Sequence, residues 1–107
     1  MIFCMSVAEP DPGADAALED CIVRIAGGDQ NALADLYGRT RPAVYGFALS
    51  IVKNAHDAED ILHDAYLQVW NAAGGYRAQG KPMAWLMTIA RNEALQLLRE
   101  RRRTVAM

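Results

Sequence analysis

Acidic and histidine side chains gather between residues 56 and 64, the stretch of the chain best equipped for chemistry. On a helix, His63 lies one turn after Asp60, so the two side chains can touch. A metal site needs three or four convergent ligands, usually from more than one element. The sequence has no second cluster of this kind, no glycine-rich phosphate loop and no nucleophile elbow. We therefore predict no catalytic residue, no metal and no cofactor, and a docking or structural role for His63.

The same segment predicts a surface for a partner protein. Read as a helix, residues 57–70 have one apolar face and one acidic face. A docking surface needs charge that steers the partner and apolar area that holds it. The acidic face offers both, through Asp60, His63, Asp64, Leu67 and Gln68. Alternatively, the acids simply favour the positive end of a helix, and Leu67 is one of many surface leucines.

Basic and amide side chains follow in the next loop and helix, and they indicate binding to nucleic acid. Arginine neutralises phosphates, while arginine, asparagine and glutamine read base edges. An aromatic ring beside cations can stack an unpaired base. The candidate residues are Tyr76, Arg77, Lys81, Thr88, Arg91, Asn92 and Arg99. The alternative is that these basic side chains only form a solvated helix end. Trp85 is assigned to the core, and a place in a base pocket is the minority interpretation.

These residues must be positioned by helices, because alanine and leucine are abundant and no segment alternates with period two. Apolar periodicity predicts helices over about 15–26, 29–40, 42–53, 57–73 and 82–103, separated by glycine pairs and prolines. Pro42 is expected to break or kink the chain near Thr40. We predict an all-α, compact bundle of four to five helices after a flexible leader, residues 1–14.

Length and charge set the remaining limits. The 107 residues suit one domain. Residues 1–64 carry eleven acids and four bases, whereas residues 65–107 carry two acids and seven bases, which favours one protein partner and one polyanion. Cys4 and Cys21 have neither metal-ligand nor redox spacing, so a reducing cytoplasm is expected. We see no signal peptide, and the longest apolar stretch falls far below the roughly 20 residues that a membrane span needs, so we expect a soluble protein.

The run from Asp57 to Trp70, the glycine-containing loop and the run from Ala84 to Asn92 together closely resemble region 2 of extracytoplasmic-function (ECF) sigma factors. These are the promoter-recognition subunits of bacterial RNA polymerase. The resemblance covers about residues 18–103, with both motifs in the family's order and spacing. It implies an all-helical domain that binds core polymerase, recognises the promoter −10 element and helps to melt it.

The resemblance also implies which residues do this. The helix that begins near Asp57 would dock on the clamp helices of the largest catalytic subunit, through Asp57 together with the acidic face described above. The loop from Asn71 to Lys81 would capture a flipped base of the non-template strand, which adds Asn71 to the DNA-binding residues, and Arg91 and Asn92 would contact the melted strand. An anti-sigma factor is expected on the acidic face. No membrane insertion is implied.

Three departures from the family remain open. Thr88 stands where a basic residue is common, and His63 stands where glutamine or glutamate is common. The family also has a second helical domain that reads the −35 element, whereas residues 104–107 are expected only to begin a linker or tail. The chain is then either a fragment or a region 2 module that works alone.

Two rival functions from other classes are weaker. A sigma-like interaction module that binds an anti-sigma factor without contacting DNA would be free to lose its basic helix face, which this chain keeps. An ordinary duplex-binding transcription factor needs a short turn between two helices, and the loop from Gly74 to Lys81 is too long for that.

Overall fold

The computed structural model describes residues 12–77 and 80–106, and within these ranges the chain forms helices and no strand. The elements in order are α2 (Pro12–Ala26), α3 (Gln30–Val52), α4 (Ala55–Ala72), the single-turn 3-10 helix η1 (Ala73–Gly75) and α5 (Pro82–Ala106). The prediction of an all-α bundle of four to five helices is confirmed.

The first and last helices both extend beyond their predicted bounds. Residues 1–11 of the predicted leader lie outside the described ranges, but residues 12–14 already belong to α2, so the helix begins three residues earlier than predicted. Proline is favoured in the first helical turn, which explains a start at Pro12. At the other end, α5 continues to Ala106, past the predicted limit at residue 103.

In neither described range does a helix combine the length and the apolar character that crossing a membrane requires.

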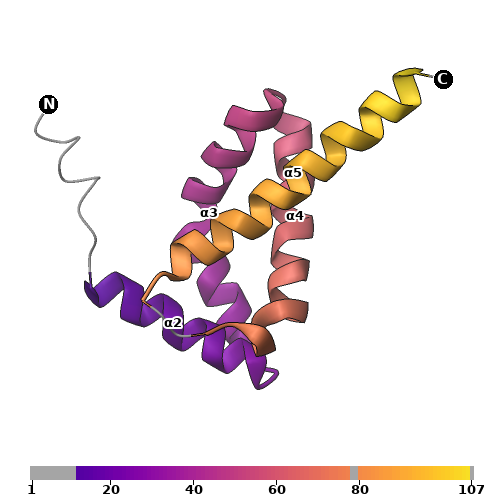
Figure 1. Ribbon diagram of the computed structural model, residues 1–107. Coiled ribbons are helices and arrows are strands. Elements are labelled where there is room, and N and C mark those ends of the chain that lie inside the picture. The colour runs from indigo at the N-terminus through magenta and orange to yellow at the C-terminus, as the bar shows by residue number, and fades with distance from the viewer. Residues whose placement is uncertain (1–11, 78–79, 107) are drawn as a thin grey trace, which may run out of the picture.

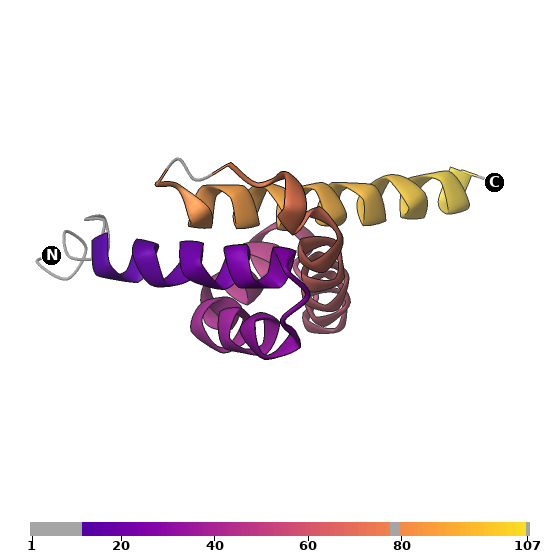
Figure 2. The ribbon, with the colours of Figure 1, turned by 90° about the horizontal axis from the view of Figure 1, so that it is seen from below.

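Figure 1 shows how the four helices are arranged. α3 and α4 run antiparallel, side by side, and α2 lies across the end of this pair where α4 leads into η1. α5 crosses one face of the pair diagonally (Figures 1 and 2). Its last turns project beyond the bundle. One half of α5 is therefore part of the core, and the other half extends away from it.

The crossing of α5 over α3 and α4 depends on small side chains. Ala48 of α3, Ala58 of α4 and Ala94 of α5 have no exposed surface and belong to one cluster with Ile61. Alanine lets helix backbones approach closely, since interaxial distance follows the size of the side chains at the contact. A larger cluster fills the space between α2 and the other helices, with Ile22 of α2 among its most buried members.

α3 runs without interruption through Pro42, so the predicted break near Thr40 is wrong. A proline inside a helix removes one backbone hydrogen bond and costs about 3 kcal/mol. Tertiary packing outweighs this cost, because Leu36, Thr40 and Val44 form one buried stripe that continues past the proline. The Thr40 hydroxyl donates to the Leu36 carbonyl (2.7 Å). Because the Thr40 hydrogen is used in that bond, Thr40 Oγ1 accepts a second hydrogen bond from the Tyr66 hydroxyl, 2.5 Å away. This bond joins α3 to α4.

Asp57 lies in the first turn of α4 and is only 2% exposed, so its predicted place on the exposed docking face is wrong. Its two carboxylate oxygens accept hydrogen bonds from Arg101 Nη1 and Nη2 of α5, at 2.5 and 2.6 Å. Such bidentate pairs are the strong, geometrically specific form of ion pair. These bonds also raise the pKa of Arg101. The side chain faces inward because a cation from α5 reaches it there.

Replacing Asp57 with alanine is expected to lower the free energy of unfolding by about 2 kcal/mol, because it removes two charge-assisted hydrogen bonds at a buried position. Arg101→Met should lower the melting temperature as well, since it leaves a buried carboxylate unpaired. Circular dichroism during thermal and urea unfolding measures both effects. Arg102→Met, a change at the neighbouring exposed arginine, is the control and should leave the melting temperature unchanged. Equal melting temperatures for the two arginine variants would contradict this account.

Candidate functional site

The exposed side of α4 carries five of the six side chains predicted to bind a partner protein, all except Asp57. They are Asp60, His63, Asp64, Leu67 and Gln68. Leu67 is 52% exposed, and it is the most exposed leucine within the described ranges. We call these five residues the α4 face.

A groove of about 550 Å³ runs beside the α4 face, between α3 and α4. His63 and Leu67 line it from α4. Leu33 and Tyr37 line it from α3, one helical turn apart, and Tyr37 is 36% exposed. The apolar area available to a partner is therefore larger than Leu67 alone, which the sequence did not indicate.

The aromatic wall of this groove is held in place by its neighbours. The Tyr37 ring packs edge-on against Tyr66, with ring centroids 4.9 Å apart. Arg41 donates from Nε to the Tyr37 hydroxyl (2.9 Å) and from Nη2 to Glu59 of α4 (3.1 Å). The guanidinium also lies over the Tyr37 and Tyr45 rings at 5.9 and 5.7 Å. These contacts fix Tyr37 before any partner arrives.

The histidines of this region show no sign of a metal site. Asp60 pairs with His56, one turn before it, at 3.8 Å, and not with His63 as the spacing allowed. Both side chains of that pair are largely exposed, so the pair contributes little. Within the described ranges, no three histidine, cysteine or acidic side chains lie close enough to hold a metal ion together.

Glu93 of α5 extends the acidic character of the α4 face across the helix boundary. Partial burial, together with the charges of Asp64 and Glu100, raises the pKa of Glu93. Burial is the main cause of this shift, and the nearby charges of Asp64 and Glu100 add to it where α4 and α5 meet; this negative charge favours a basic partner. Sequence reasoning missed Glu93, because the meeting of the two helices cannot be read from either helix alone.

A second concave site lies between the loop after η1 and the first turns of α5. Its volume is about 390 Å³. It is lined by Gly75, Tyr76, Arg77, Lys81, Ala84, Trp85 and Thr88. Four of the eight residues expected to bind DNA meet here, although the other four do not. We call this site the loop pocket.

Two aromatic rings form one wall of the loop pocket. Tyr76 and Trp85 pack edge to face, with centroids 5.0 Å apart and planes at 65°. The Tyr76 hydroxyl donates to Glu19 of α2 (2.5 Å). Trp85 packs against the core, as expected, and also lines the pocket, as the minority interpretation requires. Its position three residues after Pro82, at the start of the helix, was the only signal in the sequence.

Thr88 contributes less than a basic residue would. Its hydroxyl donates to the Ala84 carbonyl of its own helix (2.8 Å), which leaves the oxygen able only to accept a hydrogen bond. A phosphate oxygen is also an acceptor. Thr88 in this position therefore cannot donate a hydrogen bond to a phosphate, and Arg77 and Lys81 are left as the phosphate-binding side chains of the pocket lining.

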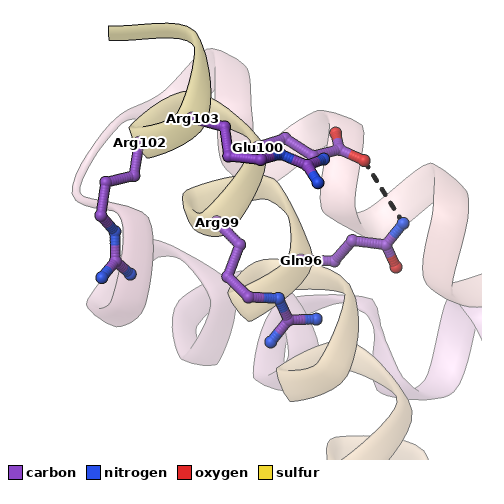
Figure 3. A pocket seen from close by; sticks show the side chains of 5 residues that line it. All are labelled: Gln96, Arg99, Glu100, Arg102 and Arg103. Atoms are coloured by element: carbon purple, nitrogen blue, oxygen red, sulfur yellow. Dashed lines mark hydrogen bonds between the residues drawn. The ribbon is translucent and has the colours of Figure 1, made fainter. Parts of the chain in front are cut away.

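The other four predicted DNA-binding residues are exposed but lie outside the loop pocket: Asn71, Arg91, Asn92 and Arg99. Arg99 belongs to a third concave region, of about 600 Å³, on the part of α5 that projects from the bundle. Figure 3 shows its lining, in which Arg102 and Arg103 point to different sides of the helix and Gln96 donates to Glu100 (3.5 Å). Residues 78–79 of the predicted loop lie outside the described ranges.

Comparisons with known proteins agree with this arrangement. A family model described as Sigma-70 region 2 matches residues 36–104, which include α4, η1 and nearly all of α5. An ECF RNA polymerase sigma factor SigK from Mycobacterium sp. strain KMS is 40% identical over 83 residues, which are 77% of this chain and 43% of the relative. A protein of the same name from Mycobacterium ulcerans is 35% identical over 89 residues, which are 82% of this chain and 48% of the relative.

The chain spans less than half the length of these relatives. The matched range contains the loop pocket and the α4 face. The resemblance to region 2 of ECF sigma factors is therefore confirmed, and the chain belongs to the sigma-70 region 2 family.

Proposed function

We propose that this chain acts as the region 2 module of an ECF-type sigma factor. It binds core RNA polymerase, takes up an unpaired base of the −10 element from the non-template strand, and so assists promoter opening. The observation that carries the proposal is the loop pocket, where Tyr76 and Trp85 form an aromatic wall beside Arg77 and Lys81. The relatives named as RNA polymerase sigma factors support it.

Capture of a base in this pocket needs no catalytic group. Taking a base out of the stack costs a few kcal/mol. Stacking on an aromatic side chain returns about 1–3 kcal/mol per base. Arg77 and Lys81 lie at the same pocket and can neutralise the flanking phosphates. Binding energy alone therefore suffices to hold the strand open, and the module acts without chemistry of its own.

The exposed side of α5 continues the path of the strand away from the pocket. Arg91 and Asn92 follow the pocket residues along the helix, and both are exposed. The basic side chains of the projecting end come next, with Arg99 and Arg102 accessible to a backbone phosphate (Figure 3). We assign the pocket to base recognition and this helix face to the phosphates of the strand and the adjoining duplex.

The α4 face and the groove beside it serve polymerase docking in this proposal. The clamp helices of the largest catalytic subunit would place an apolar side chain in the groove, against Leu67 and Tyr37. The acids Asp60 and Asp64 would pair with basic residues around it. An anti-sigma factor that covers this face would exclude polymerase by competition. Both partners place the module in the cytoplasm.

Leu67→Ala is expected to weaken binding to core polymerase about tenfold, because an anchor in the centre of an interface contributes well over 1 kcal/mol. Val23→Ala is the matched control, since Val23 is also exposed (61%) but lies on α2, away from the groove. Fluorescence anisotropy of the labelled chain titrated with core polymerase measures both affinities. Equal affinities of the two variants would remove Leu67 from the docking surface.

The double change Asp60→Arg and Asp64→Arg should lower the association rate with polymerase and reverse its dependence on salt, since steering charges act mainly on the encounter. Helix content by circular dichroism should not change, because both side chains are exposed. Stopped-flow association at two salt concentrations gives the rates. An unaltered rate at low salt would show that the partner binds elsewhere.

Recognition of the −10 element is tested by selecting single strands from a random pool with the chain and core polymerase together, then comparing a selected strand with its scrambled form. We expect a preference of at least tenfold for the selected strand. Arg77→Ala with Lys81→Ala should weaken both strands and reduce the salt dependence by about 0.7 per lost phosphate contact. Arg39→Ala, at an exposed arginine of α3 outside the pocket, is the control.

The same assay separates the proposal from an interaction module that never contacts DNA. Arg91→Ala with Asn92→Ala should weaken strand binding while polymerase binding stays at the wild-type level. A chain that only binds proteins would show no difference between selected and scrambled strands, and this double change would have no effect.

A further inference from the structure

Glu19 of α2 joins the loop pocket to a helix that contributes no residue to its lining. Its Oε2 atom accepts a hydrogen bond from the Tyr76 hydroxyl (2.5 Å) and another from the Gly80 amide (3.0 Å). We propose that Glu19 is a positioning residue that holds the loop pocket open and ordered before DNA arrives. This inference rests on the proposed role of that pocket in binding the −10 strand.

The first hydrogen bond fixes the aromatic wall. A hydrogen bond to a carboxylate is roughly twice as strong as one between neutral groups. Tyr76 is therefore held at its hydroxyl end by Glu19 and along its ring by Trp85. With the ring fixed in this way, a base meets a surface that needs no rearrangement to stack on it.

The second hydrogen bond fixes the far end of the loop. Gly80 has φ +76°, in the left-handed region that other residues adopt only with strain. This conformation accompanies an amide that donates to Glu19, immediately before Lys81. Because Tyr76 and Gly80 are both bound to one carboxylate oxygen, the neighbouring Arg77 and Lys81 are kept at the mouth of the pocket.

If Glu19 acted only through its charge, it would weaken DNA binding, whereas a positioning role strengthens it. A carboxylate close to the path of a nucleic-acid backbone repels phosphates, so its removal would strengthen binding. A positioning role predicts instead that removal of Glu19 weakens DNA binding. A loop without its hydrogen bonds to Glu19 adopts the binding-competent conformation only part of the time, and the apparent affinity for DNA falls by that fraction. The two roles differ in sign, which makes them separable.

The test compares Glu19→Ala with Glu19→Gln, using the selected −10 strand and core polymerase. Glu19→Ala is expected to bind the strand about tenfold more weakly than wild type. Glu19→Gln should bind at least as tightly as wild type, because an amide oxygen can accept both hydrogen bonds and carries no charge. Wild-type or tighter binding by Glu19→Ala would overturn the proposal. Binding by Glu19→Gln as weak as that of Glu19→Ala would also overturn it, since charge and not the accepted hydrogen bonds would be required.

The matched control is the neighbouring acid of the same helix. Asp20 is exposed and pairs with Arg24 at 2.9 Å, outside the loop pocket. Asp20→Ala removes the same charge from α2 and should leave strand binding unchanged. Tyr76→Phe keeps the ring and removes its bond to Glu19, so combining it with Glu19→Ala should weaken binding no further than Glu19→Ala alone.

Amide hydrogen exchange of Gly80 in the free chain tests the contact without DNA or polymerase. Exchange should be about tenfold faster in Glu19→Ala than in wild type and in Glu19→Gln. Unchanged exchange in Glu19→Ala would overturn the proposed contact. If the exchange result holds while even the wild-type chain selects no strand, the proposed DNA-binding function fails and the contact stands.

Discussion

The close contact of Ala48, Ala58 and Ala94 is the constraint on which the rest of this structure depends. Three of the four buried residues in this cluster carry only a methyl group, which lets α5 approach α3 and α4 closely where the three helices cross. The first turns of α5 lie on one side of the crossing and its projecting end lies on the other (Figure 1). The first turns line the loop pocket, and the projecting end carries Arg99, Arg102 and Arg103. A larger residue at any of the three positions would move both surfaces together.

Two side chains of α4, one in its first turn and one in its second half, hold α4 to the neighbouring helices. Asp57 holds the projecting part of α5 through Arg101, and Tyr66 holds α3 through Thr40. Both pairs join residues far apart in the sequence and both involve a buried polar group with its partner in place. Such groups restrict how helices can slide, because any shift leaves a buried donor or acceptor without its hydrogen bond.

The sequence was a good guide to whatever depends on periodicity. The helices and the polar side of α4 follow from the spacing of apolar residues. The sequence was a poor guide to features that are decided by a contact between two helices. The sequence predicts a break at Pro42 because the packing that overrides it comes from α4. It places Asp57 on the docking face because the partner of Asp57 lies 44 residues away. Tyr37 and Glu19 were overlooked for the same reason.

The loop pocket itself illustrates this limit. Tyr76, Arg77 and Lys81 were found because cations beside an aromatic ring are a recognisable local pattern. The role of Trp85 depends on the angle at which α5 begins, which no local pattern specifies.

The loop pocket also divides into two groups of residues with different freedom to change. Tyr76, Trp85 and Gly80 are bound to the protein itself, by ring packing, by hydrogen bonds to Glu19 and by an unusual backbone conformation. Arg77 and Lys81 project from the edges of this scaffold. A protein engineer who wishes to change how tightly the module holds a strand, and not which base it takes up, can therefore vary Arg77 and Lys81 while the scaffold, including Glu19 of α2, is left untouched.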